Sequence, residues 1–229
     1  DDTALLVMPM CHANSLYFSH TFVHLGATCV IDDRRSFDPE SLLATLAGQN
    51  VTFTSLVPTH YIMMLGLPGA TRERLDFARV TKLMISSAPA RRETKLAILE
   101  HFRNGRLYEL YGSTEAGLIA WGIGDVLLRH EGAAGYVIPG VTVESVDAAG
   151  YSVTPGASGV IRLRGPELAT YLADSPDQHE MFRDGWFYPG DVGRRLPDGR
   201  LVLEGRVDDR MNLGGFKFMP GALEAPALE

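Results

Sequence analysis

The sequence has few cysteines, no long apolar stretch and no cluster of basic residues. Its two cysteines, Cys11 and Cys29, are too few for a disulfide framework and fit a reducing compartment, so we expect a cytoplasmic protein. The apolar runs are far shorter than a membrane span. With 28 acidic and 21 basic residues the formal charge is −7, which argues against a nucleic-acid or anionic-membrane surface. Because hydrophobic residues make up 45% of the 229 positions, a globular core is expected instead.

The first part of the chain, residues 1–122, alternates predicted strands and helices. Asp38-Pro39 marks a helix start, since an aspartate followed by proline is typical of the cap and first position of a helix. A later helix is expected to bury Leu96, Leu99 and Phe102 on one face. The predicted strands are residues 51–57, 82–85 and 106–110, and the helices are residues 39–48, 59–66 and 89–105. This βαβ succession predicts a parallel sheet covered by helices.

The second part changes to short alternating strands separated by glycine and proline turns. The clearest strands are residues 141–146, 160–164 and 201–203. We therefore predict a mixed α/β chain in which a parallel-sheet part precedes a β-barrel or β-sandwich part.

Two loops that follow predicted strands carry the first candidate site, because ligands of open α/β sheets bind beyond the carboxyl ends of the strands. Residues 86–89 are small and let a planar ligand approach the backbone. Residues 111–117 combine an aromatic ring, two hydroxyls and the Glu115 carboxylate, a set that suits phosphates and Mg²⁺. The competing interpretation is that Ser113, Thr114 and Glu115 only cap a following helix, and spacing alone does not separate the two.

Two further segments contain candidate ribose or phosphate ligands. Asp191 follows a Pro-Gly turn and could accept both hydroxyls of a ribose, although an aspartate in a turn more often bonds its own backbone. Arg206 follows a predicted strand, where a guanidinium can bind ribose or phosphate. Gly214 and Gly215 either form a turn or leave space for a ligand against the backbone.

Five segments in fixed order together resemble the adenylate-forming superfamily, the AMP-forming acyl-CoA synthetases and their relatives. The first is similar to the PLxH segment, the second to the YG-S/T-TE core motif and the third to the GELxxRGP strand. The fourth resembles GWFxTGD, with Pro189 where threonine is usual, and the fifth resembles the GRxDD hinge. In this sequence they are Met8–His12, Tyr111–Glu115, Gly159–Pro166, Gly185–Asp191 and Gly205–Asp209.

The resemblance implies a two-step reaction. A carboxylate attacks the α-phosphate of ATP to give an acyl-adenylate and pyrophosphate, and a thiol, usually that of CoA, then displaces AMP. Among the site residues that it implies, Thr114 and Glu115 are the catalytic pair, and Glu115 also holds Mg²⁺. The others are nucleotide contacts at Ser87, Ala88, Pro89, Tyr111, Gly112, Ser113, Thr114, Asp191 and Arg206, an acyl pocket at His12 and Gly117, a hinge at Asp208 and a CoA tunnel at Gly214 and Gly215.

Several departures from the family pattern qualify this expectation. The family's phosphate-binding loop would precede Asp1 and its lid lysine would follow Glu229, so we expect an incomplete fragment with little activity alone. The resemblance implies part of the α/β sheet subdomain at 1–122, a β-barrel subdomain at 123–207, and a hinge with the start of a truncated C-terminal subdomain at 208–229. Glu109 stands where asparagine or glutamine is common, and Ser86-Ser87 replaces a glycine-rich pair. The alternatives are an amino-acid or aryl-acid adenylation domain that loads a carrier protein and, from another class, a non-catalytic nucleotide-binding module. The motifs leave open whether the acid is a fatty acid or an aryl acid.

Overall fold

The computed structural model describes residues 2–130, 132–172, 176–208, 211–213 and 216–218. The chain forms two compact units, which we describe separately. Unit 1 comprises Asp1–Tyr111 and Gly122–Glu131, and unit 2 comprises Gly112–Trp121 and Gly132–Glu229. Within the described ranges, no helix combines the length and the apolar character that crossing a membrane requires.

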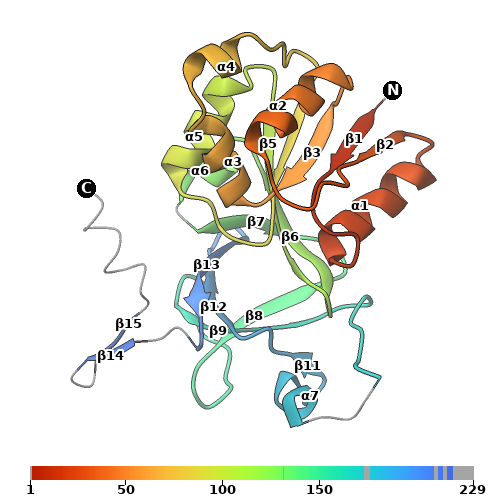
Figure 1. The fold of residues 1–229 in the computed structure, drawn as a ribbon. Coiled ribbons are helices and arrows are strands. Elements are labelled where there is room, and N and C mark those ends of the chain that lie inside the picture. Colours follow the sequence, from red (N-terminus) through yellow and green to blue (C-terminus); the bar gives the residue numbers. More distant parts are fainter. Residues whose placement is uncertain (1, 131, 173–175, 209–210, 214–215, 219–229) are drawn as a thin grey trace. The chain divides into compact units, whose positions relative to one another are not determined.

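Unit 1 contains a parallel sheet with helices on both faces (Figure 1). Its strands are hydrogen-bonded in the order β5-β4-β3-β1-β2, and every pairing in this series is parallel. The strands are β1 (Thr3–Leu6), β2 (Thr28–Ile31), β3 (Phe53–Leu56), β4 (Lys82–Ile85) and β5 (Arg106–Ser113), the last of which continues into unit 2. The helices are α1 (Ala13–His24), α2 (Pro39–Gly48), α3 (Pro58–Leu65), α4 (Gly69–Glu73), α5 (Arg92–His101) and α6 (Val126–Arg129). The predicted α/β class and parallel sheet are confirmed.

The two faces of this sheet contact different helices because successive strand residues point in opposite directions. In β1, Leu5 belongs to a large apolar cluster, which also contains buried residues of α2, α3, α5 and α6. Its neighbours Ala4 and Leu6 belong to a smaller cluster on the other face, with Phe18 and Phe22 of α1. The expected covering helices are therefore present on both sides.

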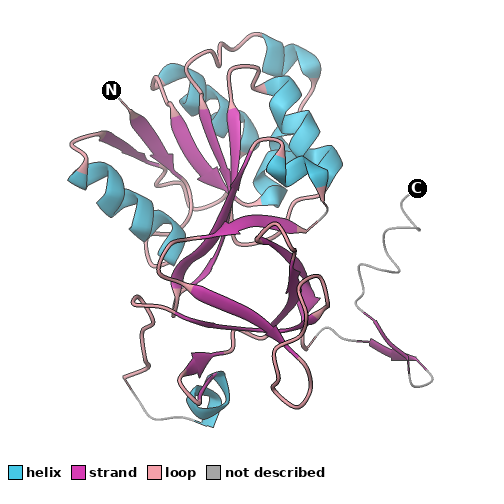
Figure 2. Cartoon of the chain, turned by 180° about the vertical axis from the view of Figure 1, so that it is seen from behind, coloured by secondary structure: helices cyan, strands magenta, loops and turns pink. Residues whose placement is uncertain are grey.

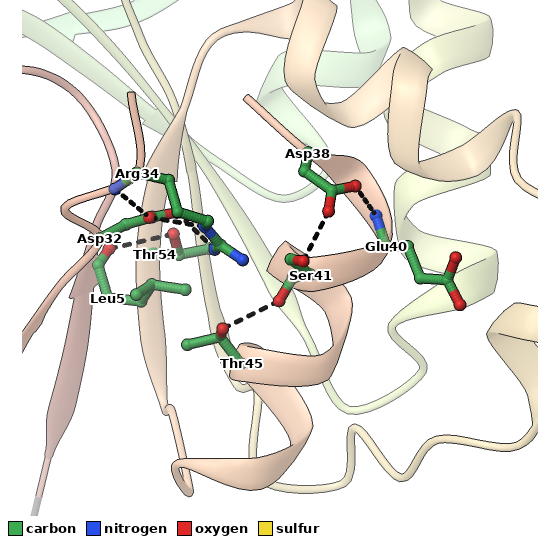
Figure 3. A network of polar contacts seen from close by, with 8 residues as sticks. All are labelled: Leu5, Asp32, Arg34, Asp38, Glu40, Ser41, Thr45 and Thr54. Atoms are coloured by element: carbon green, nitrogen blue, oxygen red, sulfur yellow. Dashed lines mark hydrogen bonds and ion pairs between the residues drawn. The ribbon is translucent and has the colours of Figure 1, made fainter. Parts of the chain in front are cut away.

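The start of α2 shows how local sequence positions a helix (Figure 3). The Asp38 side chain accepts hydrogen bonds from the Glu40 amide at 3.2 Å and from the Ser41 hydroxyl at 2.5 Å. Proline occupies the first helical turn, where its missing N–H costs nothing. The Asp38-Pro39 start signal is thus confirmed, and the leucines of α2 are buried as expected: Leu42, Leu43 and Leu46.

The buried face of α5 differs from the prediction. Phe102, which caps the helix, is 1% exposed as expected, but Leu96 is 39% exposed. The inward positions are instead Lys95 and Ile98, which precede Phe102 at helical spacing. Leu99 is partly buried and packs against the large apolar cluster, so the predicted face is correct at Leu99 and Phe102 and wrong at Leu96, next to which Lys95 is buried instead.

Unit 2 is built mainly from antiparallel strands (Figure 2). They are paired in the order β10-β11-β9-β12-β13-β7-β6, with β8 attached to β9. The strands are β6 (Gly117–Ile123), β7 (Ala133–Val137), β8 (Thr142–Val146), β9 (Gly159–Arg164), β10 (Phe182–Arg183), β11 (Trp186–Phe187), β12 (Asp191–Arg195), β13 (Arg200–Arg206), β14 (Met211–Leu213) and β15 (Phe216–Phe218), with the short helix α7 (Pro176–Met181). The strands predicted over 141–146, 160–164 and 201–203 are confirmed as β8, β9 and β13.

Candidate functional site

The loop after β4 exposes a short backbone segment at the carboxyl edge of the unit 1 sheet. Ser86 is buried, whereas the next three residues, Ser87, Ala88 and Pro89, are exposed. Ser87 has a φ of +68°, in the left-handed region that side chains other than glycine seldom occupy. Such a conformation persists only where the surrounding structure holds it. Here the loop is fixed at both ends, because it connects buried β4 to buried Ala90, which lies just before α5.

A buried ion pair lies beneath this loop. Lys95 Nζ of α5 is 2.5 Å from Glu109 Oε2 of β5, and the two side chains are 2% and 8% exposed. The Ala90 amide donates to Glu109 Oε1 at 3.4 Å, which ties the end of the loop to the same carboxylate. Burial raises the pKa of Glu109, while Lys95 and the Ala90 amide oppose this rise. Glu109, which stands where asparagine or glutamine is common in the family, therefore pairs with Lys95 in the interior of unit 1. The sequence did not predict this pair.

The Ser113–Gly117 segment is a tight turn between two strands. β5 runs through Ser113 rather than ending at residue 110 as predicted, and β6 begins at Gly117. A Cβ at Gly112 would lie 2.3 Å from the Gly117 carbonyl oxygen, so the close approach of the chain requires glycine there. The Ser113 hydroxyl accepts from the Ala116 amide at 3.1 Å. Because a strand and not a helix follows, the helix-cap interpretation of Ser-Thr-Glu was wrong.

Glu115 is the carboxylate of this turn, and it has a partner that the sequence analysis missed. The Tyr171 hydroxyl donates to Glu115 Oε1 at 2.5 Å. Burial acts to raise the pKa of Glu115, but hydrogen bonds from Tyr171, from its own backbone N–H and from Ser113 outweigh it and lower the pKa below its ordinary value. Glu115 is thus an ionised carboxylate at neutral pH. The neighbouring Thr114 is exposed.

The donor set of this turn suits a magnesium ion. Mg²⁺ prefers oxygen ligands and is usually held by one or two carboxylates together with phosphate oxygens and water. The turn offers one ionised carboxylate, Glu115, and the hydroxyl-bearing residues Ser113 and Thr114 beside it. The residues present therefore fit the ion that the motif implies.

Asp191 and Arg206, which lie in different motifs, are brought together at the start of β12 and the end of β13. They are register partners in the sheet, and Arg206 Nη1 lies 3.1 Å from Asp191 Oδ1 and 3.1 Å from the Pro189 carbonyl oxygen. Gly190 has a φ of +82°, and a Cβ there would lie 2.9 Å from Arg206 Nη2. The Arg206 side chain is 52% exposed and that of Asp191 is 16% exposed, so the pair is accessible to a ligand.

The remaining predicted residues lie in several places. His12 is exposed at the N-cap of α1, and two positions further on the Asn14 amide nitrogen donates to Ser55 Oγ at 2.9 Å and to Ser86 Oγ. Tyr111 is the last residue of the first segment of unit 1 and is partly buried, and Gly117 is partly buried in unit 2. Asp208 is exposed just after β13, whereas Gly214 and Gly215 lie outside the described residues.

Comparison with known proteins agrees with these motifs. A family model described as AMP-binding enzyme matches residues 1–172. Indoleacetate–CoA ligase of Aromatoleum aromaticum is 30% identical over 227 residues, which cover 98% of this chain and 43% of the relative. 2-Succinylbenzoate–CoA ligase of Bacillus licheniformis is also 30% identical, with 99% of this chain and 46% of the relative covered.

The fold is also similar to that of solved structures. ATP-bound MatB from Rhodopseudomonas palustris superposes with a TM-score of 0.83 at 27% identity, covering 98% of this chain and 44% of that protein. The chain thus spans less than half the length of the proteins that it matches.

Proposed function

Because the chain belongs to the family of AMP-binding enzymes, we propose that it is the central part of an AMP-forming ligase that joins a carboxylic acid to a thiol. The acid would attack the α-phosphate of ATP to give an acyl-adenylate and pyrophosphate. The thiol of CoA would then displace AMP to give a thioester. The similar CoA ligases support this assignment. The low cysteine content supports a cytoplasmic location for the enzyme.

The observation that carries the proposal is the turn between β5 and β6, in which the Glu115 carboxylate accepts a hydrogen bond from Tyr171 and the neighbouring Thr114 is exposed. Adenylyl transfer needs no protein nucleophile and depends on positioning and on stabilisation of charge. Thr114 would donate its hydroxyl to an oxygen of the α-phosphate, and Glu115 would hold Mg²⁺. When bound, the ion would neutralise negative charge on the phosphates.

The other predicted residues would bind the remaining parts of the substrates. Tyr111 would stack on adenine opposite the exposed segment 87–89, and Asp191 with Arg206 would bind the ribose hydroxyls. The Pro189 carbonyl and Asp191 hold the Arg206 guanidinium, which supports this proposed role. His12 and Gly117 would line the acyl pocket, Asp208 would act as the hinge of a lid, and Gly214 and Gly215 would line the CoA tunnel.

A carrier-protein thiol is a second candidate acceptor. Fatty acid–[acyl-carrier-protein] ligase ScoC of Streptomyces coeruleorubidus is 28% identical over 97% of this chain. A similar sequence therefore occurs in an enzyme named for an acyl carrier protein. A comparison of CoA with a phosphopantetheinylated carrier protein in an AMP-release assay separates the two acceptors. The same assay with a panel of fatty and aryl acids identifies the acid.

ATP–pyrophosphate exchange with Glu115→Gln tests the reaction. In the whole ligase we expect exchange to fall on the order of a hundredfold, since a single preorganised electrostatic contact contributes this much in other enzymes. Glu180→Gln is the matched control because Glu180 is exposed on α7. A non-catalytic nucleotide-binding module would show no exchange in any variant. Robust exchange by the 229-residue chain alone would contradict our expectation that further segments are required.

A further inference from the structure

The segment after β9 contacts the Ser113–Gly117 turn at three alternate residues. A Cβ at Gly117 would lie 2.6 Å from Glu167 Oε2, so the Glu167 side chain lies directly against the end of the turn. The Ala169 amide donates to the Glu115 carbonyl oxygen at 2.7 Å. The Tyr171 hydroxyl donates to the Glu115 carboxylate at 2.5 Å. We call residues 167–171 the brace, since they hold both the backbone and the side chain of Glu115.

The Tyr171 ring is itself held in place, although it is 42% exposed. It meets the Phe182 ring edge to face, with centroids 6.2 Å apart and an interplanar angle of 88°. Phe182 in turn contacts the fully buried Phe187 at 4.8 Å between ring centroids. The Tyr171 hydroxyl also lies 3.8 Å from Met181 Sδ. A chain of aromatic contacts thus leads from the interior of unit 2 to the hydroxyl that meets Glu115.

A hydrogen bond to one oxygen of a carboxylate can orient that carboxylate for a metal ion. Carboxylates that bind metal ions are commonly oriented by donors on one oxygen, and loss of such a donor typically weakens metal binding 10–100-fold. Tyr171 occupies Oε1 of Glu115 through a neutral hydroxyl, which does not compete with the ion for charge.

We propose that Tyr171 is a positioning residue that fixes the Glu115 carboxylate for the magnesium–nucleotide complex. This inference rests on the proposed function, since it assumes that Glu115 meets the ion. In this role Tyr171 acts through its hydrogen bond to Glu115. The brace makes the orientation of Glu115 depend on a segment more than fifty residues further along the chain, which no pattern within the 111–117 motif reveals.

The test is binding of Mn²⁺, as a paramagnetic substitute for Mg²⁺, to the whole ligase with ATP, measured by electron paramagnetic resonance. Tyr171→Phe removes only the hydroxyl, and we expect Mn²⁺ affinity to fall about tenfold. The apparent Mg²⁺ requirement of ATP–pyrophosphate exchange should rise in parallel, with the thermal unfolding midpoint unchanged. Tyr151→Phe is the matched control. Tyr151 is 74% exposed, and its backbone N–H, which the substitution keeps, donates a hydrogen bond to Asp147.

A double-mutant cycle with Glu115→Gln decides between the possible failures. If Tyr171 acts through Glu115, Tyr171→Phe should have no further effect on Mn²⁺ binding in the Glu115→Gln background. Weaker binding in Glu115→Gln with unchanged or tighter binding in Tyr171→Phe would overturn the positioning role but leave the proposed function intact. Unchanged binding in Glu115→Gln itself would overturn the assignment of Glu115 as the metal ligand.

Discussion

One ion pair from each unit shows how differently a charged pair can be placed in this chain. In unit 1, Lys95 and Glu109 are 2% and 8% exposed and lie beneath the sheet edge. In unit 2, the side chains of Arg206 and Asp191 are 52% and 16% exposed. A buried pair is costly to break, because the remaining charge has lost its hydration, whereas an exposed pair contributes little to stability. The Lys95–Glu109 pair is therefore committed to the fold of unit 1, whereas the Arg206 guanidinium in unit 2 is exposed to solvent.

The chain provides separate probes for the two units. Both tryptophans, Trp121 and Trp186, belong to unit 2. Within the part of the chain that the structure describes, helices α1 to α6 belong to unit 1 and only the short α7 belongs to unit 2. Far-UV circular dichroism at the helix band therefore reports mainly on unit 1, and tryptophan fluorescence reports on unit 2.

The largest effect is expected for Lys95→Met. This change leaves the Glu109 carboxylate buried without its cation, and loss of one partner of a buried pair costs about 3–5 kcal/mol. Urea unfolding of the purified chain, followed by circular dichroism, should show the loss directly. The fluorescence transition of unit 2 should shift less, which would sharpen the contrast between the units.

The double variant Lys95→Met with Glu109→Gln provides the control. The neutral amide keeps an acceptor for the Ala90 amide while it removes the unpaired charge, so more than half of the lost stability should return. A double variant as unstable as Lys95→Met would show that the packing of the lysine side chain, and not the ion pair, accounts for the loss.

Acidification is expected to weaken unit 1 by a smaller amount. Burial lowers the pKa of His60, and burial with nearby Arg72 lowers that of His101. Both rings contact aromatic side chains: His60 is stacked on Phe37 at 4.1 Å between centroids. An unfolded histidine has a pKa near 6.5, so the stability that these neutral rings contribute is present above about pH 6.5 and is lost as pH falls through their folded pKa values.

Thermal unfolding at several pH values checks this expectation. The unfolding temperature measured by circular dichroism should decrease as the pH is lowered from 7 to 5. In the double variant His60→Phe with His101→Phe the slope should be smaller, because neither position can then take up a proton. An equal slope in this variant would assign the acid sensitivity to carboxylates elsewhere.

The smallest effect on stability is expected for Arg206→Met in unit 2. An ion pair with this exposure contributes less than about 1 kcal/mol, so both unfolding transitions should be nearly unchanged. If Arg206 binds ribose as we propose, AMP affinity of the whole ligase should nevertheless fall about tenfold by calorimetry. Arg194→Met, which breaks another partly exposed pair of β12, serves as the comparison and should leave AMP affinity unchanged.

The sequence predicted the parts of the fold that depend on local signals. The Asp38 cap, the leucine face of α2 and strands such as β4 follow from residue type and spacing within a few positions of the chain. The five ordered motifs likewise predicted that Asp191 and Arg206 belong to one site, and β12 and β13 bring them into register. These features need no knowledge of distant contacts.

Two of the missed features depend on partners far apart in the sequence. Lys95 reads as a solvent-facing residue, because a lysine is rarely buried unless it is paired. Its place three positions before Ile98 and seven before Phe102 was the available signal, but only Glu109 on a neighbouring strand explains it. Tyr171 is separated from Glu115 by fifty-six positions, and nothing in either local pattern indicates their contact.

The buried lysine also makes the chain suited to chemical footprinting. The sequence contains three lysines, Lys82, Lys95 and Lys217, so few amines react with an acylating reagent. The Lys82 side chain is 39% exposed, whereas that of Lys95 is 2% exposed and paired with Glu109, so its amine can react only when unit 1 opens. The ratio of acylation at Lys95 to that at Lys82, measured by peptide mass spectrometry, therefore reports how often unit 1 opens enough to expose Lys95.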